Sequence, residues 1–359
     1  MLMRYRKFLI SAGIILAAVL LPSGCGRSSK RYQTQFTDVF DTVSLLTGYD
    51  QSENAFDGKA ELVHKELLED HQLFDIYHSY DGMNNLKTVN DNAGIAPVRV
   101  DRKIIDLLQF GKDAYRFTDG KVNIAFGAVL RLWHDEREAG TADPEHAVLP
   151  DAAALKEAAE HTDMDDIIID ENASTVFLQD PEMSLDVGGI AKGYSVELAG
   201  KIAEDAGSAS FLLNIGGNVK SIGSKADGSK WLCTVESPFY QDTKSGDRYS
   251  AETELDGQSL VTSGDYERYY TVDGVRYAHI IDPDTLYPGR FHRSVSILAA
   301  DSGTADAFST GLFLMTKEDG QKCIDEYNKS HAGEDTIEVL WIESDGSISC
   351  TDGFKEYMK

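Results

Sequence analysis

The sequence predicts an α+β fold with a largely antiparallel central sheet that is packed by helices. Helix and strand patterns follow one another without the regular alternation of βαβ units, and strand patterns dominate the second half of the chain. Proline is sparse, and neither a repeat nor a long low-complexity stretch follows about Tyr32. These observations favour one continuous body, large enough to form two closely joined lobes.

The first half of the chain combines one strand pattern with three helix patterns. Alternating apolar residues over 36–50 predict a strand. Apolar residues recur at helical spacing over 55–77 and again over 102–118. A third helix is predicted over 151–162, where Pro150 stands at the start.

Strand patterns dominate the second half. Residues 165–179 predict a hairpin that turns near Glu171 and Asn172. Helix patterns interrupt the strands at about 190–205 and 304–315. The other predicted strands lie within residues 208–223, 230–238, 259–282 and 292–300.

The N-terminus has the pattern of a secretory signal. Basic residues at Arg4, Arg6 and Lys7 precede an apolar run over 8–21, which is shorter than the roughly 20 residues that span a bilayer. The run ends in small residues before Cys25. The segment therefore resembles the signal of a bacterial lipoprotein.

This interpretation divides the chain into three parts. We expect residues 1–24 to be a signal peptide, Cys25 to be lipidated, residues 25–34 to form a short tether and residues 35–359 to form the folded domain. The domain would lie on the extracytoplasmic face of the bacterial cell membrane, held by a lipid anchor only. A retained N-terminal anchor is the alternative, and it gives the same location.

Composition excludes some classes of partner. The formal net charge is -26, and an acidic chain repels nucleic acid and anionic lipid. A bound phosphate must therefore be held by local geometry, a metal or a few placed cations. Cys233, Cys323 and Cys350 form no CxxC pair or Cys/His cluster, so buried thiols are favoured, and one disulfide among them stays open.

Two glycine pairs are candidates for contact with an anionic ligand. Gly188 and Gly189 lead into a predicted helix, where free backbone N–H groups and Lys192 can meet a phosphate. The spacing is not that of a Walker P-loop. Gly216 and Gly217 join two strand patterns and allow close approach of a backbone to a ligand. Tight packing and an ordinary turn are the structural alternatives.

Polar side chains also gather around the strands that follow. Thr262 and Ser263 supply hydroxyls, and Arg268 supplies a cation. His279 stands at a strand end beside a turn at Asp282, where a histidine can act as a base. The alternative for His279 is a structural side chain with satisfied hydrogen bonds.

A possible metal site lies in the last predicted helix of this region. Asp306 and Thr310 are four residues apart and so share one helix face. Two hard oxygen ligands on one face suit magnesium. Local hydrogen bonds to the helix backbone are the alternative.

Five motifs occur in the order of one known family. They are SLDVGGIAKGY, NIGGN, TSGDYERYY, HIIDPDT and ADAFSTGLF. In these motifs the chain resembles the ApbE family of FAD:protein FMN transferases, from about Phe40 to the C-terminus. FDTVSLL, NDNAG and KVNIAFGAVLRLWH are similar to the form found in anaerobic Gram-positive bacteria. The resemblance implies an ApbE-like fold, FAD as substrate and Mg²⁺ as cofactor.

The resemblance also implies a role for each motif residue. Magnesium would be held by Asp306, Thr310 and the backbone carbonyl of Gly189. His279 would be the base, with Asp186 as the alternative. The residues implied to contact FAD are Thr42, Asp186, Gly188, Gly189, Lys192, Asn214, Gly216, Gly217, Thr262, Ser263, Arg268 and His279.

The implied reaction is phosphoryl transfer. A Ser or Thr hydroxyl of an exported acceptor protein attacks the phosphate bonded to riboflavin, expels AMP and becomes linked to FMN. Family acceptors carry a motif of the type Asp-Gly-x-Ser/Thr-Gly-Ala-Thr. Residues 256–262 match it in part, but Leu260 and Val261 replace small residues, so modification of this chain's own Ser259 is not expected.

Other functions stay open at this point. A magnesium-dependent FAD pyrophosphatase would use water in place of the acceptor hydroxyl and release FMN and AMP. A flavin-binding lipoprotein would hold FAD without turnover. Both need the same pyrophosphate site. The chain could also be a solute-binding or adhesive lipoprotein, in which case the ordered occurrence of the five motifs would be a coincidence.

Two positions depart from the family pattern. Leu286 follows Thr285 where the family often has glycine, and the glycine is delayed to Gly289. Asp41 and Thr42 stand where many members have Met-Gly-Thr. Because leucine adopts a positive φ less readily than glycine, we expect the loop beneath His279 to take another shape.

Overall fold

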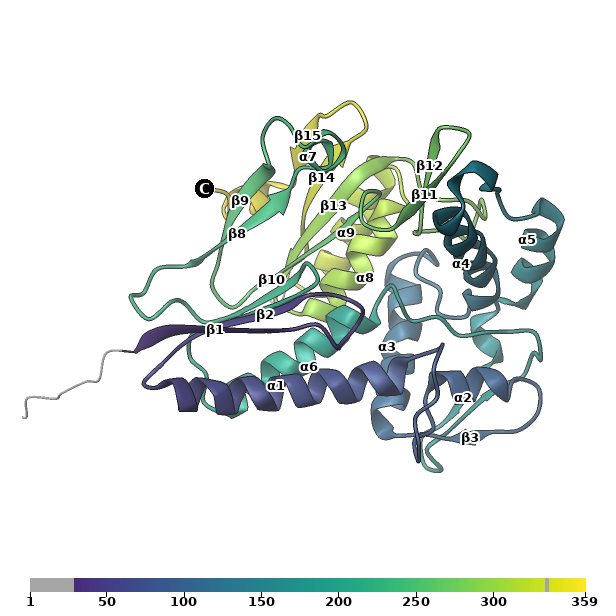
Figure 1. Cartoon of the computed structure of the whole chain (residues 1–359), viewed down its shortest axis with the longest axis horizontal. Helices are drawn as coiled ribbons and strands as arrows, with labels where there is room; N and C mark the ends of the chain where they lie inside the picture. Colours follow the sequence, from purple (N-terminus) through teal and green to yellow (C-terminus); the bar gives the residue numbers. More distant parts are fainter. Residues whose placement is uncertain (1–28, 333–335) are drawn as a thin grey trace, which may run out of the picture.

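The centre of the fold is an eight-stranded antiparallel sheet (Figure 1). The computed structural model describes residues 29–332 and 336–359. The strand order is β1-β2-β6-β7-β10-β13-β14-β15, and each neighbouring pair is antiparallel. The strands are β1 (Lys30–Phe36), β2 (Ser44–Asp50), β3 (Val98–Arg99), β4 (Ile167–Asp170), β5 (Thr175–Leu178), β6 (Phe211–Ile215), β7 (Asn218–Ile222), β8 (Trp231–Glu236), β9 (Tyr249–Leu255), β10 (Ser259–Gly264), β11 (Tyr269–Val272), β12 (Val275–Ala278), β13 (His292–Ala299), β14 (Glu338–Glu343) and β15 (Ile348–Cys350).

Helices α1, α6 and α8 cover one face of this sheet (Figure 1). In α1 the buried Phe56, Val63 and Leu67 recur at helical spacing and pack toward β2 and β6. In α8 the buried Phe308 and Leu312 pack against β13. The helices are α1 (Glu53–Phe74), α2 (Leu86–Asp91), α3 (Arg102–Phe117), α4 (Gly127–Ala142), α5 (Ala152–Ala158), α6 (Ala191–Asp205), α7 (Pro238–Thr243), α8 (Ser302–Phe313), α9 (Lys317–Ser330) and α10 (Asp352–Lys355).

The opposite face is covered by the hairpin of β8 and β9. Its Trp231 and Val235 pack against Leu260, Leu298 and Leu340, which project from the central strands. The sheet is therefore buried on both sides. That burial explains why β10 and β13 contain few exposed positions.

The second lobe contains α2 to α5 and a small sheet in the order β3-β5-β4 (Figure 1). Its core joins Leu108 of α3 to Val176 of β5 and to Ile190, which precedes α6. A neighbouring cluster joins Trp133 of α4 to Tyr270 of β11. The segment before α6 thus connects the two lobes, and the loops that meet there form the site described below.

The predicted fold class is confirmed, while one predicted strand is wrong. Residues 36–50 do not form a single strand, because Phe40 and Asp41 have φ values of 52° and 51° and turn the chain between β1 and β2. Residues 30–34, expected in the tether, pair with β2 as part of β1. The sequence also gave no prediction for helices α2, α4, α7, α9 and α10 or for strands β3, β9, β14 and β15.

Several predictions concern residues at the N-terminus. The signal peptide over 1–24 and the lipidation of Cys25 lie outside the described residues. Within the described part of the chain, no helix has the length and apolar character needed to cross a membrane.

Cys233, Cys323 and Cys350 are free thiols, so the open question of a disulfide among them is answered in favour of thiols.

Candidate active site

One cavity contains every residue that the sequence assigned to FAD, metal or catalysis. Its volume is about 910 Å³, within the roughly 300–1,000 Å³ typical of ligand sites. The wall comes from the turn before β2, the loop before α6, the β6–β7 turn, β10, the segments flanking β11 and β12, and α8. The predicted residues in this wall are Thr42, Asp186, Gly188, Gly189, Lys192, Asn214, Gly216, Gly217, Thr262, Ser263, Arg268, His279, Asp306 and Thr310.

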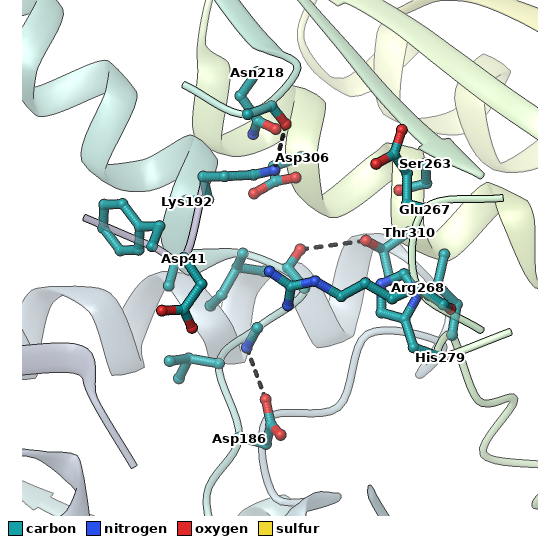
Figure 2. Close-up of a pocket in the computed structure, with 18 of the residues that line it drawn as sticks. Asp41, Asp186, Lys192, Asn218, Ser263, Glu267, Arg268, His279, Asp306 and Thr310 are labelled. Atoms are coloured by element: carbon teal, nitrogen blue, oxygen red, sulfur yellow. Dashed lines mark hydrogen bonds between the residues drawn. The ribbon is translucent and has the colours of Figure 1, made fainter. Parts of the chain in front are cut away.

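Oxygen atoms gather where α8 meets the start of α6 (Figure 2). The Thr310 hydroxyl donates to the Gly189 carbonyl over 3.4 Å, and the Gly193 N–H donates to Asp306 Oδ2 over 2.7 Å. A Cβ at residue 193 would lie 2.3 Å from Asp306 Cβ, so glycine is what lets the two helices approach. Asp306 is only 6% exposed. Burial raises the pKa of its carboxyl, although the Lys192 ammonium and the Gly193 N–H lower it.

This donor set fits magnesium. Asp306 offers a carboxylate, Thr310 a hydroxyl and Gly189 a carbonyl, and Mg²⁺ prefers such hard oxygen ligands while keeping sites for water or phosphate. Within the described residues, no three His, Cys, Asp or Glu side chains form a metal-binding group. A metal here would therefore be held by one carboxylate and neutral oxygens. A cation would also stabilise the ionised form of the buried carboxyl.

The two glycines of the β6–β7 turn bring a cation and a threonine together. Gly216 and Gly217 both have positive φ, 53° and 89°, as a two-residue hairpin turn requires. The Lys192 ammonium donates to the Gly216 carbonyl over 2.9 Å. A Cβ at Gly216 would lie 2.3 Å from Thr42 Oγ1, and the Gly217 N–H donates to Asn214 Oδ1 over 3.0 Å. The turn is therefore fixed from both sides.

Several backbone N–H groups before α6, which the sequence suggested could bind an anion, already donate hydrogen bonds within the loop. The Gly188 N–H donates to Asp186 Oδ1 over 2.8 Å, and the N–H groups of Ile190 and Ala191 donate to the Val187 carbonyl. Positive charge at this wall comes from the Lys192 side chain instead. Burial lowers the pKa of Lys192, while the nearby Asp306 raises it.

His279 is held as a neutral imidazole with a defined tautomer. Its Nδ1 lies 3.1 Å from the Arg268 carbonyl, which also accepts the His279 backbone N–H over 3.0 Å. Because a carbonyl only accepts, Nδ1 must carry the proton, and this leaves the Nε2 lone pair free to take one. Burial and then the Arg268 guanidinium lower the pKa of His279 to about 3. The ring therefore has the protonation state of a base.

Two predicted hydroxyls tie structural elements together. Thr262 Oγ1 lies 2.8 Å from Ser296 Oγ on β13. Ser263 Oγ lies 2.8 Å from Ser309 Oγ, whose hydroxyl also donates to the Asp306 carbonyl. Ser263 thus connects β10 to the helix that carries the oxygen cluster. Both residues line the cavity.

Charged side chains point into the cavity from opposite walls. Figure 2 shows Arg268 extending across the cavity toward the side where Asp41 and Lys192 lie. Asp186 lies on a third wall. Burial raises the pKa of the Asp186 carboxyl, against the effect of its hydrogen bond from the Gly188 N–H.

The sequence did not identify an aromatic and basic part of the wall. Tyr77, Trp133, His134 and Arg137 all line the cavity. Tyr77 is 54% exposed as a residue, and its ring stacks on His134 with centroids 5.1 Å apart. Trp133 and His134 end the KVNIAFGAVLRLWH motif, to which the sequence assigned no role in the site, while Tyr77 follows α1 and Arg137 lies further along the unpredicted α4. Asp41 was noted only as a departure, although its positive φ is what a glycine at that position would allow.

The loop beneath His279 contains Leu286, at which the sequence departs from the family pattern. Leu286 does adopt a left-handed backbone, with φ of 63°. Its carbonyl accepts the indole N–H of Trp133 over 2.9 Å, and its side chain packs in the aromatic cluster of α4, β11 and β12. Contacts from outside the loop therefore hold a leucine in this conformation, where the family often has glycine.

Comparison with known proteins agrees with this geometry. The ApbE family model matches residues 40–333. The FAD:protein FMN transferase of Treponema pallidum is 33% identical over 288 residues, covering 76% of this chain and 75% of that protein. The enzyme of the same name from Vibrio cholerae is 28% identical over 349 residues, covering 96% and 95%. The crystal structure of the ApbE protein from Thermotoga maritima has a TM-score of 0.78 and 29% identity, covering 92% of this chain and all of that one. On the family match and the Treponema relative together, this chain belongs to the ApbE family.

Proposed function

We propose that this protein is an FAD:protein FMN transferase that moves the FMN half of FAD onto a Ser or Thr hydroxyl of an acceptor protein. The names of its relatives support transfer of FMN. The observation that carries the proposal is the meeting, in one cavity, of a neutral base, an oxygen cluster around the buried Asp306 and two cations, Lys192 and Arg268. Phosphoryl transfer needs these parts: positioning, charge neutralisation and a proton acceptor.

The proposed step conserves atoms and charge. The acceptor hydroxyl attacks the phosphorus bonded to riboflavin, a new O–P bond forms, and the bridging P–O bond to AMP breaks. His279 Nε2 takes the hydroxyl proton, and AMP leaves with the electron pair of the broken bond. Nδ1–H stays bonded to the Arg268 carbonyl and keeps the ring oriented.

Charge on the pyrophosphate is met by side chains of the cavity wall. Lys192, held by the Gly216 carbonyl, and Arg268, which extends into the cavity, supply positive charge. Mg²⁺ bound by Asp306, Thr310 and the Gly189 carbonyl would stabilise negative charge that develops on the leaving phosphate. Asp186 orders the loop through Gly188 and is the alternative base.

The acceptor is proposed to be a separate exported protein with an Asp-Gly-x-Ser/Thr-Gly-Ala-Thr-like motif. This chain's own Ser259 does not fit that role, because its side chain is fully buried in β10 and its hydroxyl donates to the Ala300 carbonyl. Modification of Ser259 would require β10 to leave the sheet.

The test measures AMP release and acceptor mass together. The purified chain is incubated with FAD and Mg²⁺, with and without a protein that carries the acceptor motif. We expect AMP release that depends on the acceptor, an acceptor that gains the mass of FMN, and loss of both in Asp306→Ala. AMP release without a mass change would identify an FAD pyrophosphatase, and FAD binding without AMP release would identify a flavin-binding protein.

We further propose that the protein is anchored by a lipid on Cys25 outside the cytoplasm. The basic and apolar pattern before Cys25 supports this location. Cells that express the full chain are labelled with radioactive palmitate, and Cys25→Ser is expected to abolish labelling and release the protein from the membrane fraction. Labelling that survives this substitution would contradict the proposal.

A further inference from the structure

The turn beneath His279 contains a leucine in an unfavourable backbone conformation. Leu286 has φ of 63°, a region that disfavours residues with a Cβ by about tenfold or more relative to glycine. The turn connects β12, which ends one residue before His279, to β13. A change in the turn would therefore reach the proposed base through only a few residues.

Hydrogen bonds connect the turn to the segment that carries His279. The Leu286 N–H donates to the Asp282 carbonyl over 2.8 Å, and the Asp282 N–H donates to the Tyr287 carbonyl over 2.9 Å. The Gly289 N–H donates to the carbonyl of Ile280, next to His279, over 3.0 Å. The conformation of Leu286 is thus coupled to the backbone beside the base.

Trp133 of α4 holds this turn from outside. Its indole N–H donates to the Leu286 carbonyl over 2.9 Å, and the side chain is almost fully buried. The indole stacks on Tyr277 of β12 with centroids 6.0 Å apart and meets the edge of Tyr287 at 5.5 Å. One side chain therefore contacts the chain on both sides of His279.

We infer that Trp133 is a positioning residue, whose hydrogen bond to Leu286 stabilises the left-handed turn and so fixes the orientation of His279. The inference goes beyond the proposed function, and its activity readout rests on that function. It assigns Trp133 an action through the turn, although the residue also lines the cavity. If Trp133 acted only by contacting FAD, the effect of replacing it would not depend on which residue occupies position 286.

The test is a double-mutant cycle of Trp133→Phe and Leu286→Gly in the full chain. Phenylalanine keeps an aromatic ring but has no N–H to donate. Glycine adopts the left-handed backbone without help. We expect Trp133→Phe to lower kcat for FMN transfer about tenfold when Leu286 is present and less than about threefold in the Leu286→Gly background, with KM for FAD changed less than about twofold.

A matched control separates this effect from general loss of a buried indole. Trp231 is 3% exposed, and its N–H donates to the Gly223 carbonyl over 2.9 Å, but it lies on β8 outside the cavity. Trp231→Phe is expected to lower the urea midpoint of unfolding and leave kcat within about twofold of wild type. An equal loss of kcat in this control would overturn the inference.

The same cycle distinguishes failure of the inference from failure of the proposed function. Equal effects of Trp133→Phe on kcat in both backgrounds would refute the positioning role. If the wild-type protein transfers no FMN, the proposed function fails, and the cycle is read from unfolding midpoints. Trp133→Phe should then lower the midpoint more when Leu286 is present than in the Leu286→Gly background, and equal shifts would refute the inference independently of activity.

Discussion

Replacing Asp70 with asparagine is expected to stabilise the protein at pH 7.5 and to have little effect near pH 4. Asp70 is fully buried on α1, where Lys103 of α3 lies 3.0 Å away. Lys103 also contacts Glu66 and Glu69, so three carboxylates share one ammonium. Burial, assisted by repulsion from Glu66, raises the pKa of Asp70 from 3.8 to about 6 even though Lys103 lowers it.

The magnitude follows from that shift. The folded state binds the Asp70 proton more tightly than the unfolded state, so stability is greatest below pH 3.8 and is lost as pH rises through 6. A shift of about 2 units corresponds to about 3 kcal/mol at pH 7.5. Asparagine resembles the protonated acid and avoids this cost. The stability gain of Asp70→Asn should grow from less than about 1 kcal/mol at pH 4 to about 3 kcal/mol at pH 7.5.

Urea unfolding of both proteins between pH 4 and 7.5, followed by circular dichroism, measures this difference. Glu69→Gln is the matched control, because Glu69 contacts the same ammonium at 3.2 Å but is about half exposed. We expect the control to change stability by less than about 1 kcal/mol at any pH. If Asp70→Asn is instead less stable than wild type at pH 7.5, attraction to Lys103 outweighs desolvation and the reasoning is refuted.

Three further predictions concern the cavity. Asp306→Asn should reduce AMP release by at least about 100-fold at saturating Mg²⁺, because a neutral amide binds the cation poorly; retention of metal affinity in isothermal titration would argue against this ligand. His279→Gln should lower kcat by about 100-fold or more. Because burial and then Arg268 lower the pKa of His279 to about 3, the imidazole stays neutral above that pH, and the wild-type rate should show no loss with a midpoint near pH 6.5; such a midpoint would contradict the assignment. Tyr77→Ala should weaken FAD binding about tenfold in a fluorescence titration while Tyr77→Phe preserves it, since the exposed ring offers a stacking surface; equal losses would exclude stacking.

The sequence predicted elements whose local pattern agrees with their final environment. The apolar spacing of α1 and α3 matches the faces that they bury, and the Gly216–Gly217 pair gives the β6–β7 turn its positive φ values. The motif residues of the cavity were found for a related reason. Each motif combines residues that the local backbone conformation requires with a polar side chain, and both can be recognised within a few consecutive residues of the sequence.

Other elements depend on contacts that a local pattern does not contain. α4 includes Gly127 and Gly140, which lower helix propensity. A Cβ at Gly127 would lie 2.4 Å from the Ser184 carbonyl oxygen, and one at Gly140 would lie 2.8 Å from the Tyr270 ring. Packing against distant segments therefore requires these glycines. The same helix brings Trp133 to a turn more than 150 residues away, so this part of the site could not be predicted from spacing.

The close approach at Gly193 has a consequence for how this protein can change. Even one added methyl group would overlap Asp306 Cβ and the Ser302 carbonyl oxygen, which would lie 2.3 and 2.4 Å away. The absence of a side chain at residue 193 therefore determines how closely α6 and α8 approach, and with it where the Asp306 carboxylate lies. Any side chain at residue 193 would therefore push the two helices apart and displace Asp306, whereas Thr310, whose hydroxyl is only partly buried, is a position at which ion preference can be altered.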